Sequence, residues 1–132
     1  MATTDLFTVA LGLQSPWYVK DVDFDVDKER LGLFIDFPQG SRFKWPDCGQ
    51  ADCPVYDTRQ RTWRHLDFFQ HQAYLTARVP RIRCPVCGVK QIPVPWARPG
   101  SGFTLAFEIF VLQLAQSMAI KPLAELVGVH PN

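Results

Sequence analysis

The chain has 132 residues, of which 47% are apolar and 20% charged, as is ordinary for a soluble globular domain. This length allows one domain or two very small ones, and no apolar run reaches the roughly 18 residues that span a bilayer. The N-terminus has no basic leader, so we expect no secretory signal and interpret the four cysteines as thiols or metal ligands rather than disulfides.

The formal net charge of +1 conceals two oppositely charged segments. Residues 1–41 hold three basic and seven acidic side chains, whereas residues 42–98 hold ten basic and four acidic ones. A basic segment favours contact with nucleic acid. A solvated surface crossed by ion pairs has the same composition, so charge alone leaves both interpretations open.

Residues 1–41 are predicted to form an N-terminal β-hairpin. Apolar and acidic residues alternate over 21–27, and a second alternation, over 31–37, follows a polar turn. A period of two residues is typical of strands with one buried face. We expect the aspartates of the first strand to face water.

Residues 42–95 are predicted to form a zinc-ribbon-like β module. The stretches "TWRHLDFF" and "AYLTARVPRIRC" are rich in aromatic and β-branched residues, and "QHQ" between them is a plausible turn. Pro80 in the second stretch indicates an edge position or a bulge, because proline cannot donate a hydrogen bond to a neighbouring strand.

Two short stretches in this module share one pattern, Trp45-Pro-Asp-Cys48-Gly and Cys84-Pro-Val-Cys87-Gly. A Cys-x-x-Cys turn can bind Zn²⁺ through two thiolates, and the following glycine can adopt a left-handed backbone conformation. One such pair alone could equally be a redox centre. The degenerate partner favours a metal, since two such turns complete a tetrahedral site.

Tryptophan cannot ligate zinc, so the ligand set is open. We expect Cys53, five positions after Cys48, to replace the missing ligand, which gives one closed, structural Zn²⁺ site. The alternatives are a three-cysteine site completed by histidine, aspartate or water, with His65 and His71 as possible substitutes, and no metal at all. The predicted metal ligands are Cys48, Cys53, Cys84 and Cys87.

A Pro/Gly-rich linker over 96–102 precedes a helical segment over 103–132. The stretch 103–118 is predicted to be a helix that is apolar nearly all round, and such a helix is buried in its own chain or against another. Ala124 and Gly128 have the spacing of a helix-turn-helix, although an ordinary helix–helix turn has it too. The sequence ends where the recognition helix would begin, so we expect a truncated motif.

The order of these features resembles the N-terminal region of bacterial insertion-sequence transposases of the ISL-three family. The segments "TWRHLD" and "RVPRIRCPVCG" carry most of the likeness, which covers nearly the whole chain. The resemblance implies a zinc ribbon, with its four cysteines at positions 45, 48, 84 and 87, followed by a helix-turn-helix that binds terminal inverted repeats. It also implies a separate DDE-type catalytic domain, so this chain is expected not to be an enzyme.

We therefore expect an α+β fold and a DNA-binding function in the bacterial cytoplasm, in association with the nucleoid and not with a membrane. Homodimerisation is expected through the apolar helix 103–118, and the alternative function is an assembly module with no direct DNA contact. Basic side chains of the central segment are predicted to contact phosphates, which position a protein without specifying sequence. They are Arg59, Arg61, Arg64, Arg78, Arg81, Arg83 and Lys90.

Overall fold

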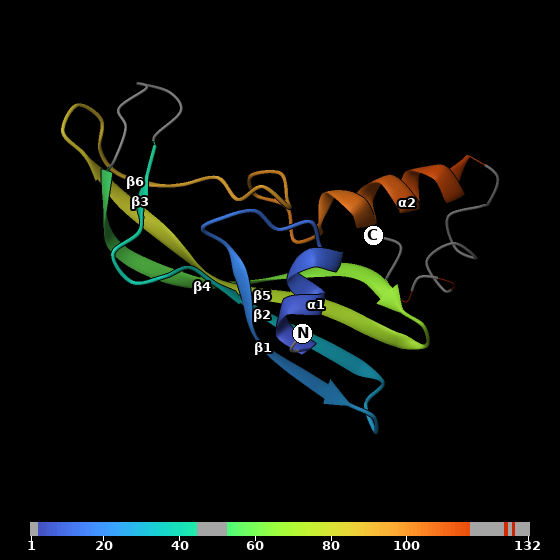
Figure 1. Ribbon diagram of the computed structural model, residues 1–132. Helices are drawn as coiled ribbons and strands as arrows, with labels where there is room; N and C mark the ends of the chain where they lie inside the picture. The colour runs from blue at the N-terminus through green and yellow to red at the C-terminus, as the bar shows by residue number, and fades with distance from the viewer. Residues whose placement is uncertain (1–2, 45–52, 117–125, 127, 129–132) are drawn as a thin grey trace.

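The computed structural model describes residues 3–44, 53–116, 126 and 128 (Figure 1). Most of the regular secondary structure in the described residues is β-strand, with one short helix near each end. The elements are α1 (Thr3–Ala10), β1 (Tyr18–Asp25), β2 (Arg30–Asp36), β3 (Arg42–Phe43), β4 (Cys53–Phe68), β5 (His71–Cys84), β6 (Gly88–Gln91) and α2 (Leu105–Ala115).

The strands form one six-stranded sheet in the order β1-β2-β5-β4-β3, with β6 also paired to β5. All pairs are antiparallel except β2 with β5, which is parallel. Strand β5 has β4 along one edge, while its other edge pairs first with β2 and then with β6. The long, twisted β4–β5 hairpin is therefore the centre of the sheet (Figure 1).

The predicted N-terminal hairpin is present as β1 and β2, which pair from Tyr18↔Asp36 to Asp25↔Arg30. On β2, Leu31, Leu33 and Ile35 are buried, as the alternation predicts. Because β2 pairs with β5, the sheet runs through both of the predicted regions, 1–41 and 42–95. Helix α1 was not predicted; it packs on β1, and its Phe7 ring lies edge-on to Phe68 at 5.8 Å.

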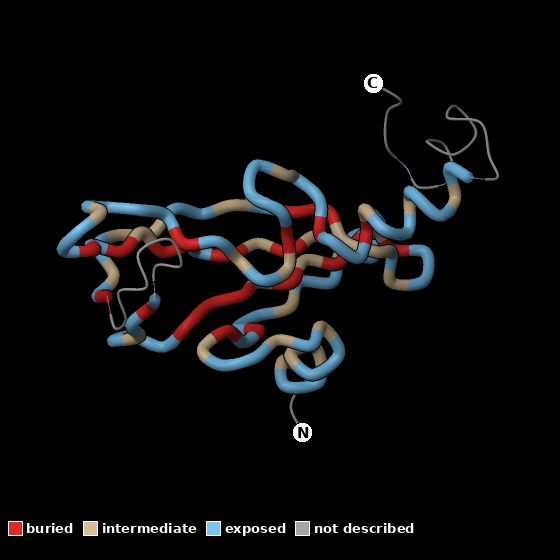
Figure 2. The backbone as a smooth tube through the Cα atoms, turned by 90° about the horizontal axis from the view of Figure 1, so that it is seen from above, coloured by how far each residue is buried: buried red, intermediate tan, exposed pale blue. Residues whose placement is uncertain are grey.

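The hydrophobic core lies between one face of the sheet and the segments that cover it. Leu75 and Trp63 contribute from the paired strands and are each 1% exposed. Trp96, from the connector after β6, packs edge-on against Trp63 at 5.4 Å and against Trp17 at 5.0 Å. The buried stretches follow the middle of the sheet, and the outer surface of α2 is largely exposed (Figure 2).

The buried face changes side along β5. From Ala73 to Val79 the buried residues occupy odd positions, whereas Ile82 and Cys84 beyond Pro80 are buried at even positions. The sheet face that forms the core at Trp63 therefore becomes solvent-facing surface at the far end of the hairpin.

Helix α2 differs from its prediction in length and in burial. It covers Leu105–Ala115 rather than 103–118, and Thr104 caps it by accepting a hydrogen bond from the Phe107 N–H. Phe107 is the buried residue of the helix, while Leu112 is 65% exposed. The expectation of a buried helix does not hold for the described part of this chain, because α2 is held to the sheet mainly through its first turns.

Two predicted features lie largely outside the described residues. The degenerate turn at 45–52 is one, and the helix-turn-helix over 120–129 is the other, of which only Leu126 and Gly128 are described. No helix within the described ranges is long and apolar enough to cross a membrane.

Candidate metal knuckle and basic face

The turn between β5 and β6 has the geometry of half a zinc site. Cys84 ends β5 and pairs with Gly88, the first residue of β6. The Cys87 N–H donates to the Cys84 Sγ at 3.4 Å, and Gly88 has a φ of 83°, which favours glycine. An N–H that points at sulfur stabilises a thiolate and orients it as a ligand. Cys84 and Cys87 therefore form a pair of thiols that fits half of a Zn²⁺ site.

Cys53 lies next to this turn. It is 1% exposed at the start of β4, where it pairs with Phe43 of β3. The pairing of β4 with β5 ends two residues away, at Val55↔Ile82, and Cys53 and Cys84 both belong to the hydrophobic core. Within the described ranges, however, no three His, Cys, Asp or Glu side chains form a group that could hold a metal. Cys48 lies outside the described residues, so the complete ligand set stays a prediction.

The two histidines considered as substitute ligands lie at the end of the β4–β5 hairpin opposite to the cysteines. His65 is twelve residues along β4 from Cys53, and His71 begins β5 whereas Cys84 ends it. At about 3.3 Å per residue each histidine is roughly 40 Å from the cysteines. Neither histidine can share a metal ion with them.

Four of the seven basic side chains predicted to bind DNA lie on one face of the β4–β5 hairpin. Asp57 pairs with Arg81 and Arg59 with Val79, so alternate residues of both strands share this face. We call the following four residues the basic face: Arg59, Arg61, Arg81 and Arg83.

The arginines of the basic face differ in whether an ion pair within the chain already neutralises their charge. Arg81 forms a two-point ion pair with Asp57, and this hydrogen bonding holds the pKa of the Asp57 carboxyl below its ordinary value. Arg83 lies over the ring of the exposed Tyr56 at 4.9 Å. Arg59 also acts electrostatically on Asp57, but within the described ranges neither it nor Arg61 nor Arg83 forms an ion pair, so these three guanidinium groups are the ones placed to meet an anion.

The other three predicted contacts lie elsewhere. Arg78 is on the opposite face, where it forms an ion pair with Asp36 at 2.8 Å. Lys90 pairs in register with Ile82 and so also lies opposite the basic face. Arg64 is only 5% exposed, and its guanidinium donates to Asp67 at 2.7 Å. The sequence showed a basic segment, but the register divides it into two faces and one buried side chain.

Arg64 belongs instead to a joint between the sheet and helix α2. Its N–H donates to the Gly102 carbonyl and its carbonyl accepts from the Thr104 N–H, both at 2.9 Å. Its guanidinium lies 4.9 Å from the Phe107 ring centroid. His65 Nδ1 is 2.7 Å from the Thr104 hydroxyl, which also caps the helix. The "TWRHLD" segment therefore positions α2, a role that the sequence alone did not indicate.

Two family models match the chain and together cover residues 46–90 and 92–132. The first is the zinc-finger of transposase IS204/IS1001/IS1096/IS1165, and the second is the helix-turn-helix domain of transposase family ISL3. The chain belongs to the ISL3 transposase family. The zinc-finger match begins one residue after Trp45 and includes all four predicted ligands, Cys48, Cys53, Cys84 and Cys87. The helix-turn-helix match includes α2.

The ISL3 assignment agrees with two curated relatives, each named as a transposase for insertion sequence element IS1557, from two strains of Mycobacterium tuberculosis. Each is 29% identical to this chain over 136 aligned residues. The alignment covers 98% of this chain but 30% of either relative, so the chain spans less than a third of their length. No solved structure matches the chain.

The joint between the sheet and helix α2 predicts that the stability of the fold depends on pH. Burial, with a smaller effect from the Arg64 guanidinium, lowers the pKa of His65 below its ordinary value. The folded state therefore favours neutral imidazole, and stability present above the unfolded pKa of about 6.5 is lost as pH falls through and below it. We expect the unfolding free energy of the wild type to fall between pH 7 and pH 5 more than that of His65→Gln, measured by urea denaturation.

An exposed substitution in the β1–β2 turn, Lys28→Gln, serves as the control and should keep the wild-type pH dependence. Equal slopes for the wild type and His65→Gln would contradict a neutral imidazole at the half-buried His65.

Proposed function

We propose that this chain is the DNA-binding N-terminal region of an insertion-sequence transposase, and that the DNA it recognises is the terminal inverted repeats of the element. The observation that carries the proposal is the basic face, which presents unpaired arginines in a chain matched by transposase zinc-finger and helix-turn-helix families. Its proposed location is the bacterial cytoplasm, on the nucleoid.

The two parts of the chain would contribute different kinds of contact. Arginines on a β-hairpin bind phosphates and supply affinity that falls with salt but is independent of sequence. Sequence is read by side chains that reach base edges, which we assign to the helix-turn-helix region over 92–132. We propose that DDE-type catalysis belongs to a part of such transposases that this chain, which spans 30% of either curated relative, does not include.

Removing phosphate contacts should weaken binding without changing sequence preference. We expect Arg59→Ala and Arg83→Ala each to reduce affinity by the same factor for element-end and scrambled duplexes. Each should reduce the slope of log affinity against log salt by about one. Fluorescence anisotropy over a range of salt concentrations measures both quantities.

The matched control is Arg78→Ala, which removes an arginine from the same strand as Arg83 but from the opposite face. It should leave the salt slope unchanged. An effect of Arg78→Ala as large as that of Arg83→Ala would contradict the assignment of the DNA-contacting face.

We also propose one structural Zn²⁺ held by Cys48, Cys53, Cys84 and Cys87. The ion would tie the ends of β4 and β5 together, and it leaves no open position for catalysis. Support comes from the N–H to sulfur contact in the second turn and from the burial of Cys53 at the start of β4, two residues before that strand pairs with β5.

Elemental analysis of the purified protein tests the ligand set. We expect one zinc per chain in the wild type and its loss in both Cys87→Ser and Cys53→Ser, because each removes a thiolate. Val86→Ala alters an exposed residue of the same turn and should retain the metal. Zinc retained at full occupancy in Cys53→Ser would overturn the recruitment of Cys53 and indicate a three-cysteine site.

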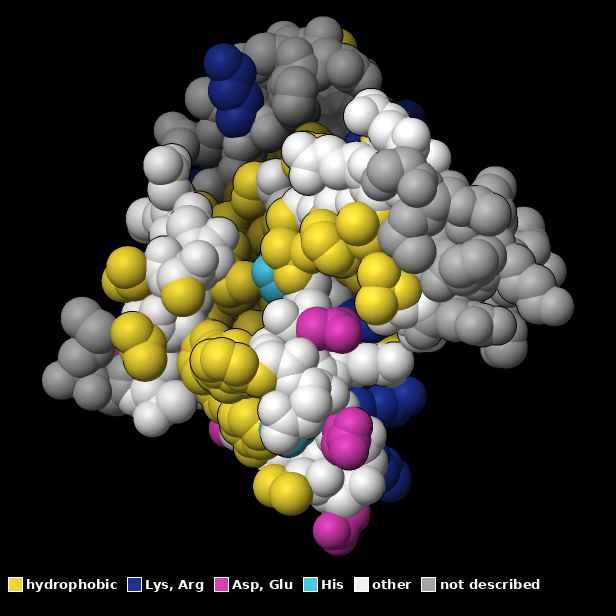
Figure 3. Space-filling model, turned by 90° about the vertical axis from the view of Figure 1, so that its right-hand side faces the viewer, with side chains coloured by type: hydrophobic (Ala, Val, Ile, Leu, Met, Phe, Trp, Pro, Cys, Tyr) yellow, Lys and Arg dark blue, Asp and Glu magenta, His cyan; other side chains and the backbone are white. Residues whose placement is uncertain are grey.

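A second candidate function, assembly, is favoured by the exposed apolar surface of α2. Ile109, Phe110 and Leu112 are 40–65% exposed, and hydrophobic side chains gather on this end of the molecule (Figure 3). Exposed apolar surfaces of this kind bind protein partners. We propose that the partner is a second copy of this chain. Light scattering should show a dimer that Phe110→Glu converts to a monomer, while Gln113→Glu leaves it intact. A monomeric wild type would rule this candidate out.

A further inference from the structure

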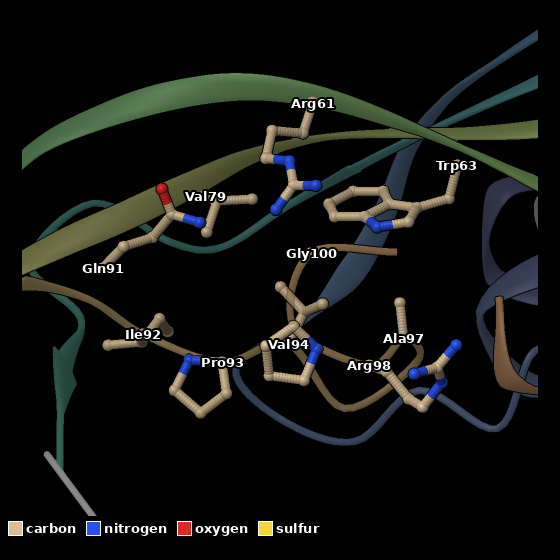
Figure 4. A pocket seen from close by; sticks show the side chains of 11 residues that line it. Arg61, Trp63, Val79, Gln91, Ile92, Pro93, Val94, Ala97, Arg98 and Gly100 are labelled. Atoms are coloured by element: carbon tan, nitrogen blue, oxygen red, sulfur yellow. The ribbon is translucent and has the colours of Figure 1, made fainter. Parts of the chain in front are cut away.

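A pocket of about 370 Å³ opens beside the basic face. Strands β4 and β5 form one side of it with Arg61, Trp63 and Val79, and the connector after β6 forms the other (Figure 4). This volume lies within the range of small-ligand sites in proteins, which begins near 300 Å³. The pocket is thus large enough for one planar ring system with a polar substituent.

The pocket combines an apolar interior with polar groups near its mouth. Trp63, Val79, Ile92 and Ala97 line it and are all at most 5% exposed. The polar lining groups are the Arg61 guanidinium, the Gln91 amide and Arg98, the last of which is ion-paired with Glu108. An apolar wall with a few directed polar groups is the usual composition of a site for a flat organic ligand.

Arg61 favours a ligand that carries a negative charge. Its guanidinium lies 5.2 Å from the Trp63 ring centroid, and the described part of the chain offers it no carboxylate. A cation held over an aromatic ring, beside a cavity and without an ion-pair partner, is suited to an anionic group outside the pocket and an apolar group inside it.

We propose that this pocket receives one unpaired nucleotide of the bound DNA, with the base inside and its phosphate on Arg61. The inference rests on the proposed DNA-binding function and extends it. Arg59, Arg81 and Arg83 share the face of Arg61, so a phosphate backbone that follows the basic face passes the pocket mouth.

The geometry also requires that the nucleotide be unpaired. A base inside a duplex is stacked and paired, and it must leave the stack before it can enter a protein pocket. The Gln91 amide can donate to and accept from the edge of a base, and the walls supply apolar contact for its faces. Such contacts favour a base that is already unpaired, because its entry into the pocket requires no free energy of unpairing.

Anisotropy with two DNA probes tests the pocket separately from DNA binding as such. One probe is a continuous element-end duplex, and the other is the same duplex with one unpaired nucleotide. We expect the wild type to bind the second about tenfold more tightly, which is the scale of one base–protein stacking contact.

Two variants should abolish this preference while leaving duplex affinity unchanged. Val94→Trp fills the pocket from the connector, and Gln91→Ala removes an exposed amide without disturbing the core. The matched control Val26→Trp adds a tryptophan at a site that is 71% exposed in the β1–β2 turn, and it should keep the preference.

The outcomes separate the two proposals. Failure to bind either probe at low salt overturns the DNA-binding function itself. Equal affinity of the wild type for both probes, with duplex binding intact, overturns the pocket alone. So does a preference that survives both Val94→Trp and Gln91→Ala, because the unpaired nucleotide would then be held elsewhere.

Discussion

The antiparallel pairing of β4 with β5 is the constraint on which the rest of the structure depends. Its register runs from Val55↔Ile82 to Phe68↔His71, and it places Trp63 opposite Leu75 in the core. A slip by one residue would move every side chain of one strand to the other face. Burial of the Trp63–Leu75 pair therefore also fixes where the arginines between the two ends must lie.

This hairpin connects three features that are far apart in sequence. The cysteine turn lies at one end, the joint with α2 at the other, and the basic face between them. Pro80 marks the change of partner along β5, since β2 pairs as far as Ala77 and β6 from Arg81. Proline fits this gap because it has no N–H to leave unpaired, and its carbonyl accepts from Ile92. The expectation that Pro80 lies at an edge is thus correct locally.

Local patterns predicted the local structure. Alternation predicted the β1–β2 hairpin, and Cys-x-x-Cys-Gly predicted the turn in which the Cys87 N–H meets the Cys84 sulfur. The positions of the arginines were not predictable in this way. Their faces depend on the β4–β5 register and on the switch of the buried side at Pro80, and both of these are set by pairing between distant residues.

The same limit explains two features of the joint between the sheet and helix α2 that the sequence did not reveal. The sequence predicted that Arg64 contacts phosphate from the surface. In the structure, Asp67, Phe107 and the segment around Thr104 enclose it. The apolar sequence of α2 predicts burial in this chain or against another, and within the described residues the helix meets the sheet at the edge of β4 near Arg64. The sequence contained one signal for this joint, the polar Arg64-His65 pair between the apolar Trp63 and Leu66.

We propose that DNA lies on the basic face of the β4–β5 hairpin and not on the face that carries Thr62 and Thr76. NMR chemical-shift mapping of the labelled chain with an element-end duplex tests this placement most directly. We expect the side-chain signals of Arg59, Arg61 and Arg83 to shift on titration, while the methyl signals of Thr62 and Thr76 stay unchanged. Shifts confined to the threonine face, with the three arginines unaffected, would contradict it.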